Sequence, residues 1–301
     1  MSRNGMQWWS LVSIAAVLAL GATTAPAAPM ASMTVSGVGF QTPESVLHDR
    51  AADVYLVSNI NGNPTAADDN GFISRVLPSG RVAALKWIDG AAPEVTLHAP
   101  KGMAIVGDTL YVTDITVVRM FDRRTGRPKG TIEVPGATFM NDLAAGPGGV
   151  VYATDSGLKP DFSPSGTDAV YRIDAAGTVR AVARAPALNH PNGVAVRPDG
   201  TVVVVTFSAT GDMYTIAPTG QRRALPAPPK GQLDGVELLP GGAMLVSSWA
   251  ASAVYRIDAA GKATVAVANV ESPADIGYDR RRGRVLIPLF TKHAVAIQAV
   301  R

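Results

Sequence analysis

The sequence AVYRIDAAG at positions 169–177 occurs a second time, without change, at positions 253–261. The two copies begin 84 residues apart, which is twice a period of about 42 residues, the usual length of one four-stranded β-propeller blade. In both copies the alternating stretch VYRI is followed by the turn sequence DAAG, as in a strand that enters a hairpin. The repeat therefore predicts a β-propeller.

A shorter pattern gives the number of blades. Six short segments are each followed, about seven residues later, by a turn and then by an apolar strand. These segments are residues 43–46, 100–103, 140–143, 191–194, 233–236 and 273–276. Six copies predict six blades, and the wider spacings after the first and third copies predict insertions at 61–71 and 157–167. No stretch after residue 27 shows apolar residues at helical spacing, which agrees with an all-β fold.

The last copy has too little chain for a complete blade. After residue 276, only residues 284–290 and 293–299 remain to form strands, which makes three strands in total. We expect residues 33–40 to supply the fourth strand by pairing with 293–299, because this closes the ring and covers its edges. The predicted domain is a six-bladed β-propeller over residues 32–301, closed by an N-terminal strand.

The N-terminal residues have the pattern of an export signal. Arg3 is the only charge before an apolar run at 8–22, which is shorter than the ~20 residues that a membrane span needs. The small residues of Ala25-Pro26-Ala27 then suit a cleavage site. We expect residues 1–27 to be a signal peptide and the mature protein to be periplasmic or secreted, without stable membrane insertion; an uncleaved anchor is the alternative. The chain has no Cys and therefore no disulfide.

The charge pattern argues against a nucleic-acid partner. The formal net charge is +3, and basic residues cluster at 123–127 and 280–284. Both clusters lie in glycine-containing turns and carry no interleaved aromatic side chains, which nucleic-acid binding surfaces commonly use. We expect a monomer with a small-molecule substrate.

One repeat position carries the candidate functional residues. In a propeller the inner strands of all blades begin at the same face, so residues at one repeat position converge on the central channel. The first position of the six copies holds Glu44, Lys101, Asn141, Asn192, Asp234 and Ala274. Four of these residues offer oxygen donors and none is His or Cys, a set that suits a hard cation. We predict that Glu44, Asn141, Asn192 and Asp234 bind one divalent cation, Ca²⁺ first, with Mg²⁺ or Mn²⁺ as alternatives, and that Lys101 lies at the rim.

Two of these residues have a structural alternative. Asn-Gly and Asp-Gly are common turn formers, so Asn192-Gly193 and Asp234-Gly235 could be turns. Each repeat, however, has its own turn about seven residues later, such as Asp199-Gly200. This spacing favours ligands over turns at the first position.

The pattern resembles the senescence-marker-protein/gluconolactonase (regucalcin-like) family of six-bladed propellers, whose wider relatives include the paraoxonases. The resemblance covers about residues 40–290, and its most specific elements are PNG at 191–193 and LDG at 233–235. It implies that Glu44, Asn192 and Asp234 hold one divalent cation, and that Asn141 contacts substrate or completes the metal shell. The sequence has Thr138 where the sugar-lactone enzymes carry Arg, which argues against an aldonolactone substrate.

The resemblance also implies a function, a metal-dependent hydrolase of a lactone or related ester. Asp234 is the expected catalytic base as well as a ligand. Lys101 occupies the position where paraoxonase-like members carry a His proposed as a base, so it either binds an anionic group of the substrate or acts as a base itself. The alternatives are a non-catalytic exported propeller that binds a protein or small ligand around a structural cation, and a metal-dependent lyase.

Overall fold

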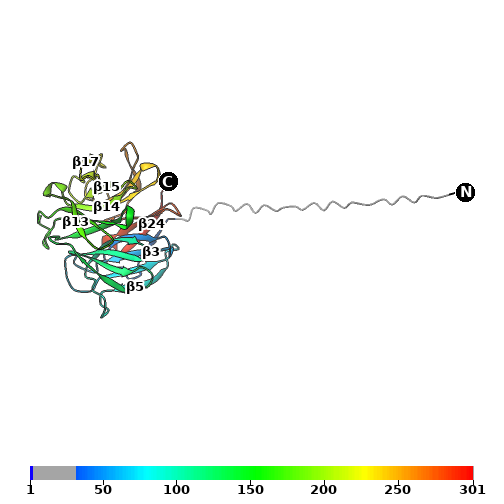
Figure 1. The fold of residues 1–301 in the computed structure, drawn as a ribbon, viewed down its shortest axis with the longest axis horizontal. Helices are drawn as coiled ribbons and strands as arrows, with labels where there is room; N and C mark the ends of the chain where they lie inside the picture. Colours follow the sequence, from blue (N-terminus) through cyan, green and yellow to red (C-terminus); the bar gives the residue numbers. More distant parts are fainter. Residues whose placement is uncertain (3–31, 301) are drawn as a thin grey trace. The chain divides into compact units, whose positions relative to one another are not determined.

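The computed structural model describes residues 1–2 and 32–300, so residues 3–27 of the predicted signal peptide lie outside the described residues. Residues 32–300 form six four-stranded antiparallel sheets (Figure 1). The first strand of each sheet contacts the first strand of the next sheet, and those of the first and last sheets also touch. The six inner strands therefore surround one channel, which confirms the predicted six-bladed propeller.

Each sheet forms one blade, and its strands are numbered along the chain. The first three blades are β2 (Pro43–Asp49), β3 (Val54–Asn59), β4 (Phe72–Val76) and β5 (Val82–Asp89); β6 (Pro100–Val106), β7 (Thr109–Asp114), β8 (Val117–Asp122) and β9 (Pro128–Glu133); β10 (Met140–Ala145), β11 (Val151–Asp155), β12 (Ala169–Ile173) and β13 (Val179–Arg184). The last three are β14 (Pro191–Val196), β15 (Val202–Thr206), β16 (Met213–Ile216) and β17 (Arg222–Leu225); β18 (Leu233–Leu238), β19 (Met244–Ser248), β20 (Ala253–Ile257) and β21 (Ala263–Ala268); β22 (Gly277–Asp279), β23 (Arg284–Leu289), β24 (Ala294–Ala299) and β1 (Met33–Val35).

Burial falls from the inner strands to the outer strand of a blade. The second strand of the fourth blade, β15, reads VVVVT and is buried at every residue, because neighbouring blades cover both of its faces. The outer strand β17 reads RRAL and is mostly exposed. In the fourth blade, a buried apolar second strand is thus combined with an exposed, basic outer strand.

The hydrophobic core is divided into six clusters, one at each interface between neighbouring blades. The cluster that joins the first and sixth blades contains Val46 and Tyr55 from one side and Leu286 and Val295 from the other. Apolar burial is the main force that holds such sheets together. The same packing thus continues around the whole ring.

The first and sixth blades are also joined by β1 and by ion pairs. β1 pairs antiparallel with β24, with Val35 opposite Val295, and is shorter than the segment 33–40 expected from the sequence. Beside this interface, Nη2 of Arg282 in the sixth blade lies 2.6 Å from Oδ2 of Asp53 in the first. β1 therefore completes the sheet of the sixth blade, and charge pairing connects this blade to the first.

The described residues contain no α-helix. No helix in this part of the chain is therefore long and apolar enough to span a membrane. Four short 3₁₀ turns occur at Pro147–Gly149, Pro186–Leu188, Pro240–Gly242 and Phe290–Lys292. The two predicted insertions are the connections from β3 to β4 and from β11 to β12. Both follow a second strand and lie at the channel end where the inner strands begin.

Candidate metal centre

The residues at the first repeat position lie where the inner strands interrupt their pairing. In five blades the ladder between the first and second strands shifts register after its first paired residue, which is Pro43, Pro100, Met140, Pro191 or Leu233. The repeat position comes directly after this residue. An irregularity of this kind re-aims a side chain, so one local feature sets the direction of five functional candidates.

Close approach of neighbouring inner strands explains the glycine that follows two of the donors. A Cβ on Gly193 would lie 2.2 Å from the carbonyl oxygen of Asp234, and a Cβ on Gly235 would lie 2.4 Å from the amide nitrogen of Ile276. Only glycine permits backbones to approach so closely. Asn192-Gly193 and Asp234-Gly235 therefore lie within strands, and the turn alternative for them is wrong.

Hydroxyl groups on the second strands hold these irregular segments in place. Thr154 Oγ1 accepts a hydrogen bond from the amide of Asp142 in its own blade and donates to the carbonyl of Asn192 in the next blade, at 2.9 and 2.6 Å. Ser247 Oγ does the same between Gly235 and Ala274, at 2.8 Å in both bonds. Each hydroxyl thus fixes the backbone next to one donor position relative to the next blade.

The four predicted metal ligands share one property. Glu44 and Asn141 are 6% exposed, and Asn192 and Asp234 are 4% exposed. Each has one buried side-chain oxygen without a hydrogen-bond partner among the described residues; these oxygens are Glu44 Oε2, Asn141 Oδ1, Asn192 Oδ1 and Asp234 Oδ1. A buried polar atom without a partner costs about 1–3 kcal/mol. Four such oxygens at one repeat position fit a shared cation.

The chemistry of this donor set also fits a hard cation. Two carboxylates and two amide carbonyls supply oxygen only, as Ca²⁺ and Mg²⁺ prefer. Within residues 1–2 and 32–300, no group of three or more His, Cys, Asp or Glu side chains is placed to hold a metal ion. A site here therefore depends on the amide oxygens of Asn141 and Asn192. Ala274, at the sixth blade's equivalent position, has no donor to add.

In two of the donors, Asp234 and Asn141, the second polar atom of the side chain is oriented by a neighbour. The indole Nε1 of Trp249 donates to Asp234 Oδ2 at 2.8 Å, and Asn141 Nδ2 donates to Ser156 Oγ at 3.0 Å. Ser156 Oγ in turn donates to the carbonyl of Pro191 at 2.8 Å. These bonds leave Asp234 Oδ1 and Asn141 Oδ1 without a partner among the described residues, as a ligand requires. Both partners directly follow the end of a second strand; that position suggested from the sequence that Trp249 could border the pocket, whereas Ser156 was not predicted.

The carboxyl groups of Glu44 and Asp234 are buried close to other acidic groups, which disfavours their ionised forms. Burial, followed by the negative charge of Asp234, raises the pKa of Glu44 well above its ordinary value. Burial and the charge of Asp275 raise the pKa of Asp234 well above its ordinary value, against the Trp249 hydrogen bond. Crowded buried carboxyl groups of this kind are stabilised by a positive partner.

Lys101 is buried, at 1% exposure, so the expectation that it lies at the rim is wrong. Its Nζ donates to the carbonyls of Pro64 and Ala99, at 3.0 and 3.1 Å, and lies 4.7 Å from the centroid of the Phe139 ring. Burial lowers the pKa of Lys101 to about 8, although the charge of Glu44 acts in the opposite direction. The ammonium group is thus held beside the donors by carbonyls and an aromatic face.

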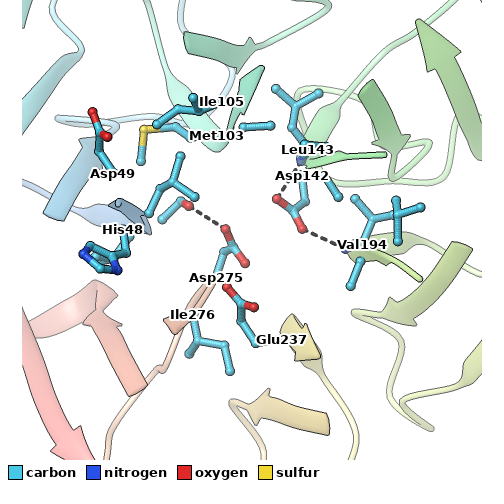
Figure 2. A pocket seen from close by; sticks show the side chains of 18 of the residues that line it. His48, Asp49, Met103, Ile105, Asp142, Leu143, Val194, Glu237, Asp275 and Ile276 are labelled. Atoms are coloured by element: carbon cyan, nitrogen blue, oxygen red, sulfur yellow. Dashed lines mark hydrogen bonds between the residues drawn. The ribbon is translucent and has the colours of Figure 1, made fainter. Parts of the chain in front are cut away.

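Beyond the donors, the channel opens into a cavity of about 470 Å³. It is lined by residues that follow the repeat position along the inner strands, and none of the four predicted ligands lines it. Figure 2 shows Asp142, Asp275 and Glu237 in this part of the channel. Asp142 accepts hydrogen bonds from the amides of Leu143 and Val194, and Ser45 donates to Asp275. Burial raises the pKa of Asp275 to about 7.

The fold and the candidate site together define a class of protein. It is a six-bladed propeller with a candidate set of oxygen donors where its inner strands begin. A family model described as the SMP-30/gluconolactonase/LRE-like region matches residues 70–278, more than half of the chain. The chain belongs to this family. No curated protein matches it.

Solved structures share the fold at low sequence identity. A gluconolactonase from Xanthomonas campestris is 19% identical, with a TM-score of 0.71 and 90% of both chains covered. The calcium-binding protein regucalcin from Agrobacterium tumefaciens is 16% identical, with a TM-score of 0.66, 90% of this chain and 94% of that chain covered. Virginiamycin B lyase from Staphylococcus aureus is 12% identical, with a TM-score of 0.64, 90% of this chain and 99% of that chain covered. At these identities the likeness shows the fold alone.

Proposed function

We propose that this protein is a divalent-metal-dependent hydrolase of lactone or related ester substrates. The observation that carries the proposal is the set of four buried oxygens at one repeat position that have no hydrogen-bond partner among residues 1–2 and 32–300. Glu44, Asn141, Asn192 and Asp234 would hold the cation, with Ca²⁺ the first candidate. Membership of the SMP-30/gluconolactonase/LRE-like family supports a lactonase-type activity.

The residues of this chain have distinct parts in the proposed reaction. A bound divalent cation polarises a carbonyl and stabilises the oxyanion. Asp234 would be ligand and base together: Oδ1, which has no hydrogen-bond partner among the described residues, has one lone pair for the cation and a second for the proton of the attacking water, while Trp249 donates to Oδ2. The water oxygen would bond to the carbonyl carbon, the ester C–O bond would break, and the leaving alkoxide would take up the proton that Asp234 accepted from the water.

Lys101 fits substrate binding better than proton abstraction. With a pKa of about 8, its amine is mostly protonated at neutral pH and donates hydrogen bonds. Two of its three N–H groups bind backbone carbonyls, which leaves one for a substrate oxygen. Asn141, held by Ser156, lies in the neighbouring blade and would contact the same substrate.

A substrate panel tests the proposal directly. Lactones, aryl esters and phosphotriesters are assayed with Ca²⁺, with chelator, and with Ca²⁺ restored after chelation. We expect lactone or ester turnover that chelator removes and Ca²⁺ restores. If no substrate is hydrolysed although Ca²⁺ binds, the hydrolase proposal fails. The alternative, a non-catalytic binding propeller with a structural cation, then takes its place.

We also propose that the protein is exported as a monomer. The support is the pattern of Arg3, the apolar run at 8–22 and Ala25-Pro26-Ala27. N-terminal sequencing of the protein from its native host is expected to give a start near Ala28. A membrane-embedded chain that still begins at Met1 would contradict the proposal.

A further inference from the structure

Three aromatic residues share a second repeat position near the donors. Phe207, Trp249 and Phe290 directly follow the second strands β15, β19 and β23. In each of these blades the amide of the aromatic residue donates to the carbonyl two residues before the first repeat position: Phe207 to His190 at 3.1 Å, Trp249 to Gln232 at 3.0 Å and Phe290 to Ser272 at 3.1 Å. The three rings thus occupy equivalent places in three consecutive blades, at the end of the channel where the donors lie.

The rings form one continuous aromatic cluster with edge-to-face and tilted contacts. Trp249 lies between the other two, with a centroid distance of 5.3 Å to Phe207 at an interplanar angle of 88°, and 5.3 Å to Phe290 at 53°. All three side chains are only partly buried. Because Trp249 also donates to Asp234, this aromatic cluster is connected directly to a predicted metal ligand.

The third blade contributes three hydroxyl groups, but they leave few hydrogen-bonding groups free for a polar ligand. Thr138 Oγ1 lies 2.9 Å from Ser165 Oγ and 2.7 Å from Thr167 Oγ1, and these two oxygens are 2.8 Å apart. The three hydroxyls therefore bond to one another. A polyhydroxylated substrate needs free donors and acceptors around its carbonyl, and this cluster offers few.

We propose that the substrate carries an apolar alkyl or aryl group close to its reacting ester bond, and that Phe207, Trp249 and Phe290 bind that group. The inference rests on the proposed hydrolase function and narrows its substrate class. Partly exposed rings gain the most from an apolar occupant, because contact removes both surfaces from water. A sugar lactone would instead lose hydration at its hydroxyls without replacement.

The test compares δ-decanolactone, which has an alkyl chain, with glucono-δ-lactone, which is polyhydroxylated. With Ca²⁺ present, we expect the full-length protein to have the higher kcat/KM for δ-decanolactone. Phe207→Ala and Phe290→Ala should each lower that value about tenfold, mostly through KM, which is the loss of one good aromatic contact. The matched control Val265→Ala removes an exposed apolar side chain from the outer strand β21 and should change neither substrate.

Binding of the matching lactams, which resist hydrolysis, separates this inference from the proposed function. Calorimetry should show tighter binding of the alkyl lactam than of the sugar lactam, and Phe207→Ala should reduce only the former. A preference for the sugar compounds, or equal losses for both classes in the variants, would overturn the inference while leaving the hydrolase proposal standing. If no lactone or ester is hydrolysed but the lactam preference holds, the hydrolase proposal fails and the apolar ligand class remains.

Discussion

The indole Nε1 of Trp249 donates a 2.8 Å hydrogen bond to Oδ2 of Asp234, while Oδ1 of the same carboxylate is buried without a partner among the described residues. The carboxylate is therefore oriented on one side and open on the other. Hydrogen-bonded neighbours of this kind set the direction and basicity of a metal ligand.

Replacing Trp249 by Phe keeps an aromatic ring but removes the N–H donor. We expect Ca²⁺ affinity to fall about tenfold, the lower end for loss of a group that orients a ligand. Calorimetric titration measures it. Trp87→Phe is the matched control, because Trp87 stacks on Arg75 in the first blade and should not affect the affinity. Equal affinities of Trp249→Phe and the wild type would show that the indole does not orient the ligand.

Asp234→Asn should have opposite effects on stability and on metal binding. The raised pKa of Asp234 means that its ionised form destabilises the folded state at neutral pH without a cation. With chelator, we expect the variant to melt about 2–4 °C higher, the change that about 1 kcal/mol produces in a large domain. With excess Ca²⁺, the wild type should gain more stability than the variant, because the variant binds the cation more weakly.

The surface variant Asp199→Asn removes the same charge from a turn and serves as the control for Asp234→Asn. It should respond to Ca²⁺ as the wild type does. Two results would contradict the role assigned to Asp234. One is a melting temperature of Asp234→Asn below that of the wild type in chelator; the other is an equal rise in melting temperature for Asp234→Asn and wild type on addition of Ca²⁺.

The repeat made much of this architecture predictable. Glu44 and Asp234 are far apart in sequence, yet the blade period alone places both at the same channel position. The role of Gly193 could not be predicted from the sequence, because tight turns and close contacts between strands both favour glycine. The burial of Lys101 was also unexpected, since lysine is rarely buried. It depends on carbonyls and an aromatic face from other segments, which no local pattern shows.

Lys101→Met should strengthen Ca²⁺ binding, because it removes a positive charge that acts on Glu44. We expect a gain of about threefold to tenfold at low salt, for one charge at close range in a partly screened site. Turnover should fall, since the free N–H of Lys101 is assigned to substrate. Calorimetry and steady-state kinetics on the same preparation give both numbers. Weaker Ca²⁺ binding would mean that Lys101 supports the donor geometry, and unchanged turnover would remove its substrate role.

The ring closure predicts a pH-dependent stability term. Hydrogen bonds from Arg282 hold the pKa of Asp53 well below its ordinary value. A lowered pKa stabilises the folded state above the unfolded-state pKa, about 3.9, and this term is lost as the pH falls below that value. Asp53→Asn should therefore cost about 1 kcal/mol at pH 7, and the cost should shrink below about pH 4.

Urea unfolding of Asp53→Asn and wild type, at pH 7 and at pH 3 and below, measures this difference. Asp108→Asn removes a more exposed carboxylate, which pairs with Arg123 at 3.3 Å, and should change stability little at either pH. A cost that is constant with pH would show that the Asp53–Arg282 pair is not responsible.

The central claim is that Glu44, Asn141, Asn192 and Asp234 together bind one divalent cation. Its most direct test is a calorimetric titration of Ca²⁺ into chelator-treated, full-length protein and into Glu44→Gln and Asn192→Ala. We predict one site per chain in the wild type, and at least about a tenfold loss of affinity in each variant, since each removes a charge or a ligand. Absence of binding to the wild type at millimolar Ca²⁺, Mg²⁺ and Mn²⁺, or wild-type affinity in both variants, would contradict the account.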